Sequence, residues 1–128
     1  MRLALALAAL LLVSPAVAAS PEGAFRRRGA YPLGATVFAL DSAEHFVGRF
    51  TTGHPDDANH CGGTFTATGH REQENRLVFS GKPEDGRACR VTMTFNRSFD
   101  QALIEEDGCT FYHGASCAFD GTVLRDSR

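Results

Sequence analysis

A Tyr-His-Gly triplet, Tyr112 to Gly114, lies between two of the four cysteines of the chain, Cys109 and Cys117. The triplet combines an aromatic ring, a titratable imidazole and a glycine. Crosslinks on both sides would hold this loop rigid, and a rigid loop with an aromatic side chain forms a low-entropy surface for contact with another protein. We therefore take Tyr112, His113 and Gly114 as the candidate partner-binding residues.

The same triplet also fits a purely structural turn. In that interpretation Tyr112 packs on the end of the fold, His113 bonds a backbone carbonyl, and Gly114 takes a positive φ. The sequence leaves both interpretations open.

Three consecutive acidic residues, Glu105, Glu106 and Asp107, precede the loop and suggest general acid–base catalysis with His113. Neighbouring residues of a strand point to opposite faces, so we expect at most one of these acids to share a site with the imidazole. A solvated strand end explains them more simply. Because no nucleophile elbow, phosphate-binding loop or metalloprotease motif occurs, we expect a protein that is not an enzyme and has no cofactor.

A second cluster of possible ligands spans residues 54–60, where His54 and His60 flank two aspartates. Zinc or copper would accept these ligand types. Their spacing matches no known ligand motif, and His, Asp, Asn and Pro are also common loop formers. A metal-binding envelope protein using His54 and His60 is thus an alternative function, and no metal site is expected.

Alternation of apolar and polar residues predicts the elements that position these loops. Residues 89–96 show it most clearly, with Cys, Val, Met and Phe at every second position. Similar patterns predict seven strands, near residues 34–40, 45–52, 62–69, 76–80, 88–96, 101–106 and 117–125. Short strands joined by polar turns favour an all-β fold, a small antiparallel up-and-down barrel or sandwich of about seven to eight strands.

Ten Phe and no Trp predict a Phe-rich core. A small barrel either fills with side chains or keeps one cavity, so a carrier of a small apolar ligand is a further alternative function.

The N-terminus predicts export. Met1-Arg2, an apolar run over residues 3–13 and small residues at 16–19 have the layout of a secretory signal peptide, with cleavage near Ala18 or Ala19. The run is too short to span a bilayer, and no cysteine lies near the cleavage region to accept a lipid. We therefore expect a periplasmic or secreted protein without a membrane anchor, divided into a signal peptide (1–19), an irregular segment (20–33) and a single β domain (34–128).

The charge of the mature chain argues against two classes of partner. Of the 13 Lys and Arg, Arg2 leaves with the signal peptide, so 12 basic residues face 15 acidic ones and the net charge is −3. Nucleic acids and anionic membranes bind proteins with an excess of positive charge, so neither is an expected partner. We interpret the one basic run, residues 26–28, as a solvated arm.

Four cysteines, Cys61, Cys89, Cys109 and Cys117, predict two disulfides in an exported chain, each stabilising the fold by about 2–4 kcal/mol. An up-and-down strand order gathers all four at one end of the barrel. Pairing the neighbouring strands across their turn places Cys89 opposite Gly108, next to Cys109, which favours bridges Cys89–Cys109 and Cys61–Cys117. The sequential pattern, Cys61–Cys89 with Cys109–Cys117, stays open as an alternative.

Residues 89–121 read Cys-x-Val-x-Met-x-Phe followed by Cys-x-x-Tyr-His-Gly-x-x-Cys-x-Phe-x-Gly. This pattern resembles that of small exported bacterial proteins, mostly of unknown function, some of which are described as lysozyme-inhibitor-like. The resemblance implies a compact periplasmic β-barrel whose activity is binding or inhibition, with a cell-wall lytic enzyme such as lysozyme as the partner.

Overall fold

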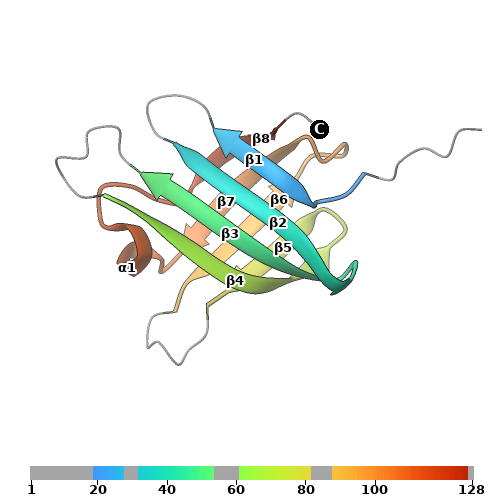
Figure 1. Cartoon of the computed structure of the whole chain (residues 1–128), viewed down its shortest axis with the longest axis horizontal. Helices are drawn as coiled ribbons and strands as arrows, with labels where there is room; N and C mark the ends of the chain where they lie inside the picture. Colours follow the sequence, from blue (N-terminus) through green and yellow to red (C-terminus); the bar gives the residue numbers. More distant parts are fainter. Residues whose placement is uncertain (1–18, 28–31, 54–60, 82–87, 127–128) are drawn as a thin grey trace, which may run out of the picture.

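Eight antiparallel strands close into a barrel in the computed structural model, which describes residues 19–27, 32–53, 61–81 and 88–126 (Figure 1). Each strand pairs with its neighbours in sequence, and β1 pairs with β8 to close the wall. The elements are β1 (Gly23–Arg27), β2 (Leu33–Ser42), β3 (His45–Gly53), β4 (Gly62–Gln73), β5 (Arg76–Ser80), β6 (Arg90–Phe95), β7 (Gln101–Asp107), α1 (Thr110–His113) and β8 (Gly121–Arg125). The predicted all-β antiparallel barrel is confirmed.

The strand that the sequence analysis missed is β1, which lies in the segment predicted to be irregular. Its Phe25 is fully buried, and the strand pairs with both β2 and β8. Arg26 and Arg27 of the basic run belong to β1 and not to an arm, although the Arg26 side chain is 65 % exposed; Arg28 lies outside the described residues. Arg26 Nε donates to both carboxylate oxygens of Asp126, at 3.1 and 2.8 Å, and Arg27 donates to the Asp120 carbonyl at 3.1 Å. Five residues with a single fully buried side chain are too short for alternation to reveal a strand.

Phenylalanine rings fill the interior of the described barrel, as the composition predicted. Phe79 lies across two glycines of neighbouring strands, Gly48 and Gly69, and a Cβ at either position would overlap its ring. The ring of Phe50 meets Phe79 edge-on, with centroids 5.1 Å apart. Eight Phe are buried in all: Phe25, Phe46, Phe50, Phe65, Phe79, Phe95, Phe99 and Phe119. This packing lends no support to the alternative of an apolar-ligand carrier.

The disulfides join Cys61 to Cys117 and Cys89 to Cys109, with Cα atoms 6.0 and 4.6 Å apart. The favoured pairing is thus confirmed, and the sequential alternative is wrong. The predicted register is confirmed too, because Val91 of β6 lies opposite Glu106 of β7. All four cysteines lie where β3 meets β4, β5 meets β6 and β7 meets β8. We refer to this as the cysteine end of the barrel and to the other as the opposite end.

Candidate functional site

Residues 109–117, here named the cap, fold over the cysteine end of the barrel. The predicted Tyr-His-Gly loop is largely a single helical turn, α1, in which Tyr112 N–H donates to the Cys109 carbonyl at 2.8 Å and Gly114 N–H donates to the Thr110 carbonyl at 2.8 Å. The helix ends at His113, and the following Gly114 has a φ of +87°, in the region that favours glycine, as the structural interpretation of the triplet predicts. In Figure 1 α1 lies beside the start of β4.

The cap approaches β4 so closely that its neighbour there has to be glycine. A Cβ on Gly63 would overlap the carbonyl oxygen of Tyr112. The cap is therefore seated on the barrel by backbone contact as well as by its two disulfides.

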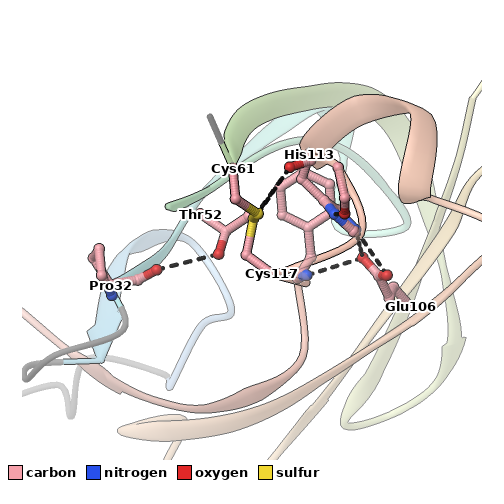
Figure 2. Close-up of a disulfide and its surroundings, with 8 residues drawn as sticks. Pro32, Thr52, Cys61, Glu106, His113 and Cys117 are labelled. Carbon is pink, nitrogen blue, oxygen red and sulfur yellow. Dashed lines mark hydrogen bonds and ion pairs between the residues drawn. A yellow bond between two sulfur atoms is a disulfide. The ribbon is translucent and has the colours of Figure 1, made fainter. Parts of the chain in front are cut away.

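His113 is buried inside the cap, with 3 % of its surface exposed. Its Nε2 lies 2.8 Å from each carboxylate oxygen of Glu106, and its Nδ1 lies 2.6 Å from the Gly114 carbonyl oxygen (Figure 2). Both groups around the ring are hydrogen-bond acceptors, so each ring nitrogen faces an oxygen of the fold. His113, one of the candidate partner-binding residues, therefore has no exposed imidazole, and its contact with a backbone carbonyl is the one that the structural interpretation of the triplet gives it.

Glu106 connects three segments of the cysteine end. It occupies an inward position of β7, in line with Ala102 and Ile104, and its side chain is only 11 % exposed. Besides the imidazole, its Oε2 accepts the Phe119 N–H at 2.9 Å, and the Phe119 ring packs edge-on against His113 at 4.9 Å. The interpretation of this acid as part of a solvated strand end is wrong.

The Cys61–Cys117 disulfide lies against the backbone of His113 (Figure 2). Each of its sulfur atoms is 3.1 Å from the carbonyl oxygen of His113. Disulfide sulfurs carry no proton, so these are close polar contacts and not hydrogen bonds. His113 is held by the Glu106 carboxylate at its ring and by the disulfide at its backbone carbonyl, so both ring nitrogens and the carbonyl oxygen have partners within the fold.

The aromatic residues of the cap lie nearer the surface. Tyr112 is half-buried, and its ring meets Phe65 edge-on at 4.9 Å. Phe111, which the sequence analysis did not select, is 62 % exposed, and its ring lies edge-on to Tyr112 at 5.5 Å. With His113 directed inward, Phe111 is the large apolar side chain that the cap presents to solvent.

His54 and His60 lie outside the described residues. Within the part of the chain that the structure describes, no group of three or more His, Cys, Asp or Glu side chains could hold a metal ion. In the same part, no helix has the length and apolar character needed to cross a membrane.

Comparison of the chain with protein-family models, with curated proteins and with solved structures found no significant match.

Proposed function

We propose that this protein is a non-enzymatic, exported binding protein that contacts a protein partner through its cap. The observation that carries the proposal is the exposure of Phe111 on a segment immobilised by two disulfides and by the buried His113–Glu106 pair. A preorganised aromatic side chain loses little entropy on binding, and such residues supply much of the energy of protein interfaces. Tyr112, packed beside Phe111, extends this surface.

The resemblance to lysozyme-inhibitor-like proteins makes a cell-wall lytic enzyme such as lysozyme the first partner to test. A cap that enters the substrate cleft would block it with Phe111 and Tyr112, because the buried His113 cannot reach a catalytic carboxylate. The mature net charge of −3 would assist the encounter with a cationic enzyme only weakly, and salt would screen this attraction.

The proposed location is the periplasm or the medium. Two disulfides agree with an oxidising compartment outside the cytoplasm. Cleavage of the signal peptide near Ala18 or Ala19 stays a prediction, since residues 1–18 lie outside the described part of the chain.

The test is inhibition of a C-type lysozyme that clears a cell-wall suspension, with the mature protein in micromolar excess. We expect slower clearing, and Phe111→Ala should weaken inhibition at least tenfold, as loss of an interface anchor worth about 1.4 kcal/mol or more would do. Phe38→Ala is the matched control, because Phe38 is a similarly exposed ring (57 %) on the outer wall of the barrel. Absence of inhibition by the mature protein would rule out lysozyme as the partner, and an equal loss in both variants would rule out the cap as the contact surface.

A further inference from the structure

Two histidines lie directly opposite each other on the outer wall of the barrel. His45 begins β3 and His70 lies in β4, and the two residues are partners in the register of these strands. Phe46, the next residue of β3, is buried, so the exposed His45 points outward, and His70 is exposed on the same face. The two imidazoles therefore stand side by side on the solvent face of the wall.

The hydrogen-bonding pattern brings these two side chains close together. The Arg71 N–H donates to the Glu44 carbonyl at 2.9 Å, so Arg71 and Glu44 occupy a hydrogen-bonded position of the ladder. Hydrogen-bonded and non-hydrogen-bonded pairs alternate along antiparallel strands, which puts His45 and His70 in a non-hydrogen-bonded pair. In such a pair the Cα atoms lie about 4.5 Å apart, closer than in the other kind. Two imidazoles at this spacing can bind the same metal ion.

The hairpin before His45 sets the orientation of its ring. His45 Nδ1 lies 3.5 Å from a carboxylate oxygen of Asp41 and 3.5 Å from the Ser42 hydroxyl oxygen. Nδ1 is thus directed at the hairpin, and Nε2, on the other side of the ring, has no hydrogen-bond partner among the described residues. A carboxylate at one ring nitrogen is a common second partner of a metal-binding histidine, because it holds the imidazole in the form whose other nitrogen is the ligand.

The surroundings of the pair favour a cation. His45, His70 and Asp41 line the same hollow of the outer wall, and the ring nitrogens of His70 have no partner within the described chain. Asp41 is exposed and supplies a negative charge beside the imidazoles. The nearest cation in β4, the guanidinium of Arg71, is directed away from them, because it lies 5.5 Å from the centroid of the buried Phe46 ring.

We propose that His45 and His70 bind one divalent transition-metal ion, Cu²⁺ most tightly, through one ring nitrogen each. Imidazole is a preferred ligand of Ni²⁺, Cu²⁺ and Zn²⁺, and Cu²⁺ binds most tightly of the three at a given site. No group of three or more His, Cys, Asp or Glu among the described residues could hold a metal ion, so water completes the coordination. The pair lies beside the hairpin of β2 and β3, at the opposite end from the cap, so the inference is independent of partner binding.

The experiment titrates the ¹⁵N-labelled mature protein with Cu²⁺ at neutral pH and follows the amide signals, because this paramagnetic ion broadens the signals of nearby nuclei. We expect the signals of residues 44–46 and 69–71 to broaden first. Loss of an outer-shell partner typically costs about 10- to 100-fold in metal affinity, so loss of a ligand should cost at least tenfold. Calorimetric titration should show this loss for His45→Ala and for His70→Ala, since each variant keeps only one imidazole of the pair.

The matched control is the double variant His54→Ala with His60→Ala, which removes two histidines outside the described residues and should keep the affinity of the site. Zn²⁺ and Ni²⁺ should bind the mature protein more weakly than Cu²⁺ does. Broadening that begins elsewhere in the chain, an affinity that either single variant leaves unchanged, or an equal loss in the control would each overturn the two-histidine site. These outcomes do not depend on whether lysozyme is inhibited, because the cap takes no part in them.

Discussion

The two ends of the barrel are closed by different interactions. At the cysteine end the cap is held by two disulfides, by a buried carboxylate–imidazole pair and by backbone contact with Gly63. The opposite end is closed without covalent bonds. There the guanidinium of Arg125 lies 4.5 Å from the centroid of the Phe25 ring and donates to the Phe99 carbonyl at 3.0 Å.

The difference follows from how far the strands extend. At the opposite end the long strands β2 and β4 run into tight hairpins, so the wall itself reaches over the core. At the cysteine end β5 and β8 are short, and a segment with little regular structure has to cover the Phe-rich interior. Such a segment gains few backbone hydrogen bonds, and crosslinks compensate by restricting the unfolded chain. The cysteine end, where β5 and β8 are short, is therefore also the end where the exposed Phe111 ring is held rigidly.

Of the changes that test this difference between the two ends, removal of the Cys61–Cys117 disulfide is expected to reduce stability the most. In the variant Cys61→Ala with Cys117→Ala we expect the free energy of unfolding to fall by about 4 kcal/mol, because the bridge closes a loop with a sequence separation of 56. Urea denaturation gives the loss, and amide hydrogen exchange locates it. Exchange should increase more in α1 than around Arg125; an equal increase at both ends would show that the ends do not open separately.

Loss of the buried Glu106 carboxylate is expected to have the second-largest effect on stability. Glu106→Ala leaves His113 and the Phe119 N–H without their acceptor, and removing one partner of a buried pair costs about 3 kcal/mol or more. The neighbouring Glu105 is exposed on the same strand, so Glu105→Ala should change stability by less than about 0.5 kcal/mol. Chemical denaturation of both variants measures the difference, and similar losses would mean that the His113–Glu106 pair contributes little.

Part of this site could be predicted from the sequence. Alternation gave seven of the eight strands, and the register that it implied around residues 97–100 led to the favoured disulfide pairing. The same alternation places Glu106 on one face of β7 with Ala102 and Ile104. The signal for its inward position was thus present, but the general tendency of carboxylates to be solvated favoured the opposite interpretation.

Other features of the site could not be predicted from the sequence. α1 is a single turn, so no helical period distinguishes its inward residue, His113, from its outward residue, Phe111.

The close approach of the cap to β4 predicts a substitution with an intermediate effect on stability. Gly63→Ala places a methyl group where the Tyr112 carbonyl lies, and we expect it to destabilise the protein by about 2 kcal/mol, within the range for overpacking a filled site. Gly53→Ala is the control in the neighbouring strand β3, because among the described residues a Cβ there would meet only Pro32, at 3.9 Å. Thermal or urea unfolding separates the two, and a neutral Gly63→Ala would contradict the tight seating of the cap.

The smallest expected effect is at the opposite end. Arg125→Met keeps an unbranched stem against Phe25 but removes the cation and its bonds to the carbonyls of Phe99, Ser20 and Glu22, for a loss of about 1–2 kcal/mol. Water can replace part of these bonds because Arg125 is only half-buried, whereas the His113 imidazole beneath the cap is buried. Arg49→Met, at an exposed position on the outer wall, should change stability by less than about 0.5 kcal/mol. If denaturation shows that Arg125→Met costs as much as Glu106→Ala, each end depends equally on one polar residue, and the crosslinks alone distinguish the cysteine end.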